Sequence, residues 1–319
     1  MKKRTIGLGA VLSAAAASGF AFSQFLMYSR LKTDEEIIEK ETKNGHFNKE
    51  EFEALDKREV SIPSRFGYTL NGFIAFSGNN RERFVIVSHG VTMNTYSSIK
   101  YMNLFLELGY NVLVYDHRRH GKSGGKSTSF GYYEKYDLQS AVHWLKREYG
   151  RDITLGIHGE SLGAASMLLY AGAVEDGADF YIADCPFEDL EELLVWRMNN
   201  EMKKFPRWPF MPIASLFLKL RGGYWMKEVS PVRAVSKIKK PVLFIHGRQD
   251  ETIPFSCSEN LYNRKKGSKQ IYLPGNTGHA MSYTENRREY TQIVDSFLDE
   301  AAAGHYQRRR IESGRRLYL

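Results

Sequence analysis

The sequence predicts an α/β fold in which helices cover both faces of a mostly parallel sheet. From Val60 onward, short apolar runs alternate with segments of helical periodicity. Most of these runs are continuously apolar, as strands buried on both faces should be, and strand–helix alternation is typical of parallel sheets. We expect strands at residues 71–77, 84–88, 111–115, 153–158, 180–183, 241–246 and 270–273, and helices at 97–108, 132–149, 161–173, 256–264 and 283–303.

Length and composition allow one large domain with a substantial core. The chain has 319 residues, of which 42% are hydrophobic, and a formal net charge of +8. Part of this charge comes from five arginines in the last dozen residues, which we interpret as a solvated basic tail at 304–319 rather than a nucleic-acid-binding segment. Two cysteines, Cys185 and Cys257, cannot form a disulfide framework and lack the spacing of a metal site.

The composition of residues 1–30 indicates a transmembrane segment. Lys2, Lys3 and Arg4 precede the uncharged stretch Ile6–Met27, which is long enough to cross a bilayer as a helix. We favour an uncleaved signal-anchor, single-pass, with the rest of the chain outside the cytoplasm. A cleaved signal peptide and a secreted protein are the alternative, because Ala21-Phe22-Ser23 resembles a cleavage site. A helix packed on the folded domain ranks third.

The remaining chain divides into a connector, a domain and an insertion. Residues 31–59 are charged and amphipathic, and we expect a helical connector. The domain spans residues 60–303. Within it, residues 186–230 interrupt the strand–helix alternation and are rich in aromatic residues and proline. Because this segment falls between two expected strands, we interpret it as a small helical lid whose apolar side chains could line a pocket.

A turn between an expected strand and an expected helix predicts a nucleophile at Ser161. The sequence Gly159-Glu-Ser161-Leu-Gly163 joins the two elements. In such a nucleophile elbow a strained turn exposes the serine hydroxyl, and the glycines let neighbouring backbone pass without a Cβ clash. A serine nucleophile further requires an acid and then a histidine later in the chain.

Both partners follow Ser161 in the required order. His279 lies in a glycine-rich loop after the last expected strand, and Asp250 lies in the loop after residues 241–246. An imidazole can take the serine proton near neutral pH, and a carboxylate fixes its tautomer and stabilises its cation. We therefore expect a catalytic triad of Ser161, His279 and Asp250. Asp184, also just past a strand, is a rival for the acid, and Glu251 is a poorer one.

These motifs resemble those of the α/β-hydrolase superfamily over residues 60–303. They are similar in particular to bacterial serine aminopeptidase-like and cinnamoyl-ester-hydrolase-like members, and to Gram-positive hydrolases with an N-terminal anchor. The resemblance implies an eight-stranded sheet and an oxyanion hole made by the backbone N–H groups of Leu162 and Val91, with Thr92 or Asn94 as a possible side-chain donor. The motifs that carry the resemblance are Gly159–Gly163, His246-Gly-x-x-Asp250-x-x-x-Pro254, Gly278-His279, Ser88-His89-Gly90 and Tyr115–Gly124.

Two further motifs receive structural interpretations. Asp116 to His120 has metal-ligating side chains, but the same segment is a hydrogen-bonded loop in the family that it resembles. Gly121 to Ser127 lacks the spacing of a phosphate-binding loop. His89 is interpreted as a structural turn residue. We expect no metal and no cofactor.

The sequence thus indicates a serine hydrolase that cleaves a carboxylic ester through an acyl-Ser161 intermediate. A serine peptidase or amidase on the same triad is the alternative, and a non-catalytic binding protein is a weaker one. An exopeptidase needs an acidic group for the substrate amine, and the start of the lid offers Glu188, Asp189, Glu191 and Glu192. The expected partners are a small-molecule ester or peptide and a membrane, with no nucleic acid. The oligomeric state and the acyl group stay open.

Overall fold

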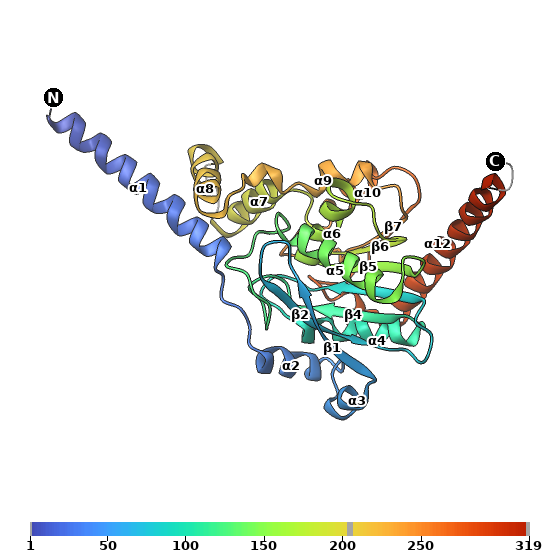
Figure 1. Cartoon of the computed structure of the whole chain (residues 1–319). Coiled ribbons are helices and arrows are strands. Elements are labelled where there is room, and N and C mark those ends of the chain that lie inside the picture. Colours follow the sequence, from blue (N-terminus) through green and yellow to red (C-terminus); the bar gives the residue numbers. More distant parts are fainter. Residues whose placement is uncertain (1, 203–206, 317–319) are drawn as a thin grey trace.

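A central sheet flanked by helices dominates the structure, a computed structural model (Figure 1). It describes the backbone of residues 2–202 and 207–316, and side chains within residues 13–200 and 207–302. The strands are β1 (Lys57–Pro63), β2 (Thr69–Ala75), β3 (Arg83–Ser88), β4 (Asn111–Tyr115), β5 (Thr154–Glu160), β6 (Phe180–Asp184), β7 (Val242–Ile245) and β8 (Lys269–Tyr272). The principal helices are α1 (Lys2–Met27), α2 (Asp34–Lys43), α3 (Lys49–Ala54), α4 (Ile99–Glu107), α5 (Glu134–Tyr149), α6 (Leu162–Ala173), α7 (Leu190–Met202), α8 (Arg207–Gly222), α9 (Pro231–Ala234), α10 (Ser256–Arg264), α11 (Ser282–Glu285) and α12 (Arg287–Arg316).

The described residues form one eight-stranded sheet in the order β1-β2-β4-β3-β5-β6-β7-β8. Strand β2 pairs antiparallel with both β1 and β4. The pairings from β4 to β8 are all parallel. The register places Ser88 opposite Gly159 and Glu160 opposite Asp184. The carboxyl ends of the three central strands therefore meet at one edge of the sheet, where ligands of such folds bind. The predicted fold class is confirmed.

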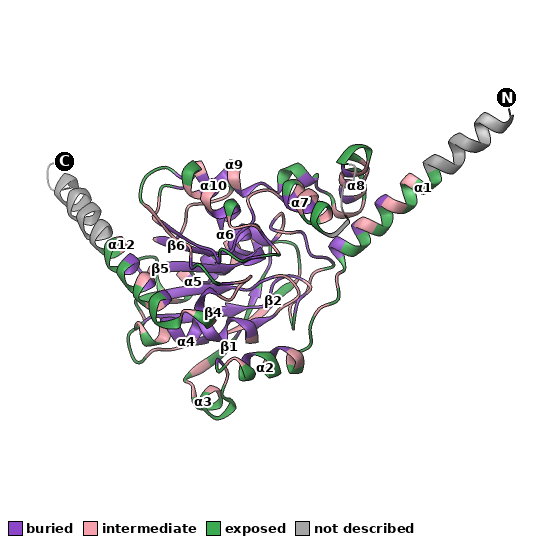
Figure 2. Cartoon of the chain, turned by 180° about the vertical axis from the view of Figure 1, so that it is seen from behind, coloured by how far each residue is buried: buried purple, intermediate pink, exposed green. Residues whose placement is uncertain are grey.

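Helices bury both faces of the sheet, as the continuously apolar strands require (Figure 2). On one face, α5 and α6 contribute Leu138, Leu168 and neighbouring apolar residues to a core cluster. On the other face, α4 and α12 contribute Phe105 and Phe297 to a second cluster. The central strands are thereby held rigidly beneath the loops that follow them.

The first strand was not expected as an element. The connector predicted for residues 31–59 contains α2 and α3, but β1 already begins at Lys57. Only Val60 and Ile62 of this edge strand are buried, and they alternate with exposed polar residues. Such an alternation is typical of an edge strand with one solvent-exposed face. A search for continuous apolar runs does not detect this pattern.

The segment interpreted as a lid, residues 186–230, contains α7 and α8, and α8 packs against α1. The end of α1 is part of a third apolar cluster, in which Leu26 and Met27 are buried with Met211 and Leu218. Among the described residues, no helix is long and apolar enough to cross a membrane. The predicted span begins within residues 1–12, whose side chains lie outside the described residues, as do those of the basic tail at 304–319.

Candidate active site

Ser161 lies in a sharp turn between β5 and α6. Its backbone has φ 54° and ψ −111°, a left-handed conformation that is strained for a residue with a Cβ. The Ser161 N–H donates to the Asp184 carbonyl at 2.8 Å, which fixes the turn on the neighbouring strand. A Cβ at Gly163 would lie 2.0 Å from the Ser88 carbonyl oxygen, and one at Gly159 would lie 2.5 Å from the Ala164 nitrogen. Only glycine at these two positions lets the turn close.

Three side chains predicted to act together form a continuous chain of hydrogen bonds. Ser161 Oγ lies 3.1 Å from His279 Nε2, and His279 Nδ1 lies 2.6 Å from Asp250 Oδ2. With the proton on Nδ1, His279 donates to the carboxylate and presents an acceptor to the serine hydroxyl. Ser161 and Asp250 are buried, whereas His279 keeps partial contact with solvent. The arrangement can take a proton from Ser161 and stabilise the resulting imidazolium.

Asp250 is held as an anion by hydrogen bonds to both of its oxygens. Oδ1 accepts from the backbone N–H groups of Thr252 at 2.8 Å and Ile253 at 2.9 Å. Burial alone raises its pKa, but hydrogen bonds from His246 and His279 outweigh burial and hold the pKa of Asp250 well below its ordinary value. The carboxylate therefore stays charged at every pH at which a histidine could act as a base.

His246 orients this carboxylate, a role that sequence reasoning missed. Its Nε2 lies 3.0 Å from Asp250 Oδ2 and 2.9 Å from the Ile253 carbonyl, so Nε2 must carry the proton. Its Nδ1 then accepts from Ser258 Oγ at 2.8 Å. The signal was present in the His-Gly-x-x-Asp spacing, which we used as a motif without giving the histidine a function.

The two rival acids lie elsewhere. Asp184 is fully buried, and its Oδ2 lies 3.0 Å from the Tyr101 hydroxyl and 3.1 Å from the Tyr290 hydroxyl. Glu251 is exposed on the loop surface. The structure thus brings Asp250, and neither rival, to His279.

A buried ion pair includes Glu160, the residue that precedes Ser161. Lys100 Nζ on α4 lies 2.7 Å from Glu160 Oε2, and both side chains are almost fully buried. The same ammonium donates to the carbonyl of Ala280, which follows His279, at 3.1 Å. The Tyr101 hydroxyl also lies 2.9 Å from Glu160 Oε2, and its single proton can be donated either to Glu160 or to Asp184. This pair connects the residue before Ser161 to the loop that carries the histidine, and the sequence analysis did not identify it.

The residues expected to form the oxyanion hole line the same pocket as Ser161. Leu162 begins α6, and Val91 lies on the loop after β3. This loop passes close to the nucleophile, since a Cβ at Gly90 would lie 3.6 Å from Ser161 Cβ. Asn94 turns away, because its side chain donates to Asp34 at 2.5 Å and accepts from the Tyr96 N–H at 3.0 Å. Asn94 is therefore engaged on α2 rather than directed at the pocket.

The histidine-rich loop after β4 is a buried structural element. Asp116 accepts from the backbone N–H groups of Thr95 and Lys122, each at 2.8 Å. Burial lowers the pKa of His89 to about 4 and that of His120 to about 3, so both are neutral near pH 7. They connect the loops after β3 and β4, because His120 Nε2 accepts from the Thr92 N–H at 3.1 Å. The geometry agrees with the structural interpretation of this motif.

Cys185 lies close to Asp250 and His279. Possible ligand atoms of Cys185, Asp250 and His279 lie within 4.8 Å of one another. Burial raises the pKa of the Cys185 thiol well above its ordinary value, so the thiol keeps its proton near pH 7. The other two side chains are engaged with each other.

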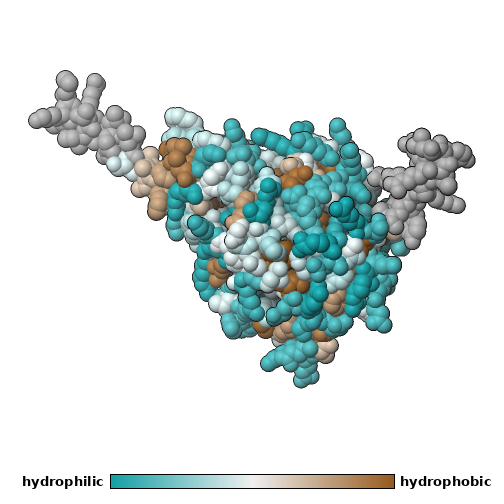
Figure 3. Space-filling view, viewed as in Figure 1, coloured by the Kyte–Doolittle hydropathy of each residue, from teal (hydrophilic) through white to brown (hydrophobic). Residues whose placement is uncertain are grey.

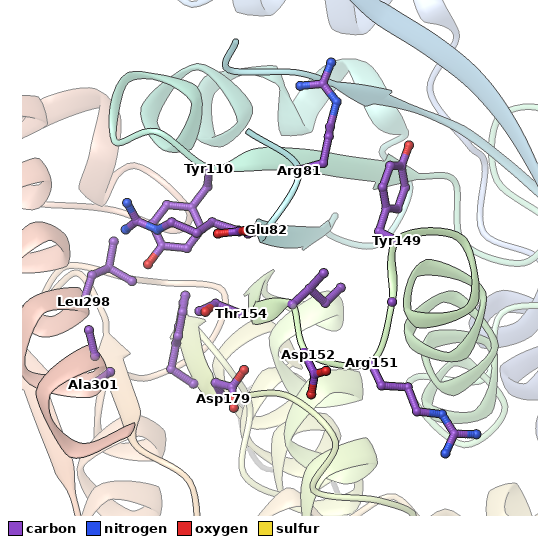
Figure 4. Close-up of a pocket in the computed structure, with 15 residues that line it drawn as sticks. Arg81, Glu82, Tyr110, Tyr149, Arg151, Asp152, Thr154, Asp179, Leu298 and Ala301 are labelled. Carbon is purple, nitrogen blue, oxygen red and sulfur yellow. The ribbon is translucent and has the colours of Figure 1, made fainter. Parts of the chain in front are cut away.

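A pocket of about 270 Å³ opens beside Ser161 and His279. The lid supplies Phe187 and Leu193 to its wall, and Ile253 adds a further apolar surface. A larger hollow of about 720 Å³ lies at the opposite ends of the strands, beside Arg83 of β3 and other residues shown in Figure 4. This hollow is at the amino ends of the parallel strands, whereas ligands of such folds bind at the carboxyl ends, so the smaller pocket is the candidate active site.

Comparison with known proteins supports a hydrolase in general. The chain is 51% identical to the Bacillus subtilis protein YqkD over 94% of this chain and 98% of that one. It is 27% identical to lysophosphatidylserine lipase ABHD12 of Rattus norvegicus over 61% of this chain and 50% of that one. The Pyrococcus furiosus esterase Pf2001 has a similar structure, with a TM-score of 0.64 and 26% identity over 80% of this chain and 96% of that one.

A family model extends these likenesses over most of the domain. It carries the description "Prolyl oligopeptidase family" and matches residues 96–305. This range holds Ser161, Asp250 and His279, and the fold and the esterase neighbours agree with the α/β-hydrolase superfamily. The chain belongs to the prolyl oligopeptidase family of α/β-hydrolases.

Proposed function

We propose that the protein is a serine hydrolase that cleaves a carboxylic ester through an acyl intermediate on Ser161. The hydrogen-bonded chain from Ser161 through His279 to Asp250, beside an apolar pocket, carries this proposal. The esterase and lipase relatives agree with it, although the family name also includes peptidases.

In the first half of the reaction, Ser161 Oγ attacks the ester carbonyl carbon while His279 Nε2 takes the hydroxyl proton. The carbonyl oxygen becomes an oxyanion that the N–H groups of Leu162 and Val91 stabilise, each by roughly 3–4 kcal/mol. His279 then donates its proton to the leaving alcohol as the carbon–oxygen bond breaks. In the second half, water loses a proton to His279 and attacks the acyl group, and Ser161 recovers its proton as the acid leaves.

The lid favours an ester over an aminopeptidase substrate. An aminopeptidase needs an acidic group near the pocket to bind the substrate amine. The described residues that line the pocket do not include the four candidates, Glu188, Asp189, Glu191 and Glu192. Arg207 contacts Glu191 at 3.0 Å and Glu192 at 2.7 Å, and Glu188 accepts from Asn260 at 3.0 Å. Asp189 accepts from the Glu191 N–H at 3.0 Å, at the start of α7. Glu191, Glu192 and Asp189 are thus engaged within the lid, and Glu188 is engaged with α10.

A fluorophosphonate probe tests the nucleophile, and a substrate panel tests the reaction. Wild-type protein should be labelled at Ser161 and should release para-nitrophenol from a para-nitrophenyl ester in a burst, and Ser161→Ala should lose both. An unchanged burst in Ser161→Ala would remove Ser161 from the mechanism. Faster turnover of an aminoacyl para-nitroanilide than of the ester would favour the peptidase, and no labelling of folded wild-type protein would favour a non-catalytic role.

We also propose that the chain associates with a membrane through α1, with the hydrolase domain outside the cytoplasm. Exposed apolar side chains gather where α1 meets α8, as Figure 3 shows. Trp208 and Leu220 on α8 are 78% and 71% exposed, and Phe25 on α1 is 65% exposed. Such aromatic and apolar surfaces favour the membrane interface. Lys2 to Arg4 precede them and favour a cytoplasmic N-terminus.

Cell fractionation tests this association. The full-length protein should be found in the membrane pellet and should resist alkaline extraction. The hydrolase domain should be protected from protease that is added on the cytoplasmic side. Release of a shortened chain into the medium would instead support the cleaved signal peptide. Leu220→Asp on α8 should reduce the fraction of the protein in the membrane pellet. Ser296→Asp on the exposed side of α12 is its matched control, since each variant adds one charge to a solvent-facing helix position, and it should leave that fraction unchanged.

A further inference from the structure

Three basic side chains line the pocket that holds Ser161. Lys32 belongs to the connector, Lys40 to α2 and Arg197 to α7, so three separate segments bring positive charge to one place. Among the described residues that line this pocket, Glu160 is the only carboxylate, and Lys100 neutralises it at 2.7 Å. The lining therefore carries a net positive charge from Lys32 and Lys40, even when Arg197 is not counted.

The connector is fastened where it can present these charges. The Lys32 N–H donates to the Thr92 carbonyl at 3.0 Å, one residue from Val91. The Thr33 side chain caps α2, and Asn94 donates to Asp34 Oδ1 at 2.5 Å. The first turn of α2 is thereby attached to the loop that contains the expected oxyanion donor.

Nearby carboxylates already have partners. Glu36 accepts from Arg30 at 2.6 Å and from the Thr33 N–H at 2.9 Å, and Asp34 accepts from Asn94. Glu36 is thereby held on its own segment, and Asp34 is held on the loop after β3. None of the acidic residues in the first turn of α2 belongs to the described lining of the pocket, whereas Lys32 and Lys40 do.

Apolar surface lies beside this charge. Phe187 and Leu193 from the lid line the same pocket, as do Phe130, Met93 and Ile253. A neutral apolar ester would use only this surface, and a small hydrophilic anion would use only the cations. An amphiphile that carries both an acyl chain and an anionic group matches the whole lining.

We propose that the pocket selects carboxylic esters that carry a negative charge, which Lys32, Lys40 and Arg197 bind. The anionic group is a carboxylate, sulfonate or phosphate on either side of the ester bond. This inference rests on the proposed ester hydrolase function and adds the substrate class. Because the cations contact a part of the substrate that does not react, they stabilise the bound substrate and the transition state alike. Their effect therefore appears in KM and in kcat/KM, and less in kcat.

The experiment compares kcat/KM for anionic and neutral esters of similar length. Mono-para-nitrophenyl glutarate carries the charge on the acyl side, an acyloxybenzenesulfonate carries it on the leaving group, and para-nitrophenyl valerate is neutral. A solvent-exposed ion pair changes binding by about 2- to 5-fold. Replacing all three cations by glutamine should therefore lower the anionic-to-neutral ratio about tenfold or more for one of the anionic probes. Added salt should lower the wild-type ratio in the same direction.

Lys43→Gln is the matched control, because Lys43 is exposed at the end of α2 and does not line the pocket. It should leave the ratio unchanged. Thermal unfolding of the triple variant and the three single variants checks that each is folded. An unchanged ratio for both anionic probes in the folded triple variant overturns the proposal, and so does a ratio that falls equally in Lys43→Gln.

A binding measurement separates this inference from the proposed function. Calorimetric titration of Ser161→Ala with monohexyl phosphate, and with hexanol as the neutral probe, requires no turnover. Preferential binding of the phosphate that the triple variant loses supports the cationic subsite even if no ester is hydrolysed. Ester hydrolysis without preferential phosphate binding supports the hydrolase and overturns the subsite.

Discussion

Lys100→Met should destabilise the protein strongly, although it replaces a helical lysine by a good helix former of similar length. Lys100 Nζ lies 2.7 Å from Glu160, and the two side chains are 5% and 7% exposed. The variant leaves the carboxylate in a site where water cannot replace the ammonium. Breaking a buried ion pair on one side costs about 3–5 kcal/mol, and we expect a loss of that size in the free energy of unfolding.

The charge on Glu160, rather than the volume of Lys100, should cause this loss. Burial alone raises the pKa of Glu160, but Lys100 and Tyr101 outweigh burial and lower it. In the wild type, this pair adds stability that is present above the unfolded-state pKa and is lost as the pH falls through the lower folded-state value. In Lys100→Met the buried carboxyl group prefers its proton, so the destabilisation should shrink as the pH falls toward 5.

Urea unfolding at several pH values measures this prediction. The double variant Lys100→Met/Glu160→Gln removes both charges, so it should be less destabilised than Lys100→Met and lie within roughly 1–2 kcal/mol of the wild type. The reasoning fails if Lys100→Met costs less than about 1 kcal/mol, or if the double variant loses the sum of the two single losses. Ester turnover, measured in parallel, should also fall in Lys100→Met, because Lys100 holds the carbonyl next to His279.

Three further predictions follow from the site. Asp250→Asn should reduce kcat by roughly 10⁴, because the amide favours the wrong tautomer of His279, and it should also lower the free energy of unfolding at pH 7, because the hydrogen bonds that lower the pKa of Asp250 stabilise its anion; an esterase assay that finds kcat unchanged would contradict the role of Asp250. Gly163→Ala would place a Cβ 2.0 Å from the Ser88 carbonyl and should cost more than about 3 kcal/mol in urea unfolding, whereas Gly275→Ala, which meets nothing within 4 Å, should be tolerated. Burial raises the pKa of Asp184 from 3.8 to about 6, so its stabilising proton should be lost, and the free energy of unfolding should fall, as the pH rises from about 4 to 6. Asp184→Asn should remove that part of the pH dependence, and an unchanged slope would contradict the assignment.

Local patterns predicted most of the sheet and the nucleophile. Buried parallel strands are continuously apolar, so the runs at 84–88 and 111–115 indicate β3 and β4 without knowledge of their neighbours. The strained turn at Ser161 needs glycine at positions 159 and 163, and both lie within two residues of the serine, so a short sequence motif is enough to recognise the turn. The edge strand β1 was not predicted, because an alternation of apolar and polar residues over a few positions also occurs in many segments that are not strands.

The ion pair and the supporting histidine depend on contacts between distant positions. A lysine on an amphipathic helix is normally solvated, and nothing beside Lys100 indicates Glu160 as its partner. The available signal is that Lys100 stands between Ile99 and Tyr101, within a run of buried residues on α4. A charge at such a position requires a buried countercharge, but the sequence alone does not say which acid supplies it.

The N-terminal region shows most clearly why composition does not define a domain boundary. Residues 1–30 have the composition of a membrane segment, and residues 31–59 have that of a solvated connector. Yet Leu26 and Met27 are buried against the lid, where each contributes about 1.5–3 kcal/mol, and the Lys32 N–H is bonded to the loop beside the pocket. A segment that holds the lid on one side and an active-site loop on the other is part of the site, whatever its remaining residues contact. Polar substitutions at Leu26 or Met27 should therefore disturb the packing of α8 and, through it, the pocket.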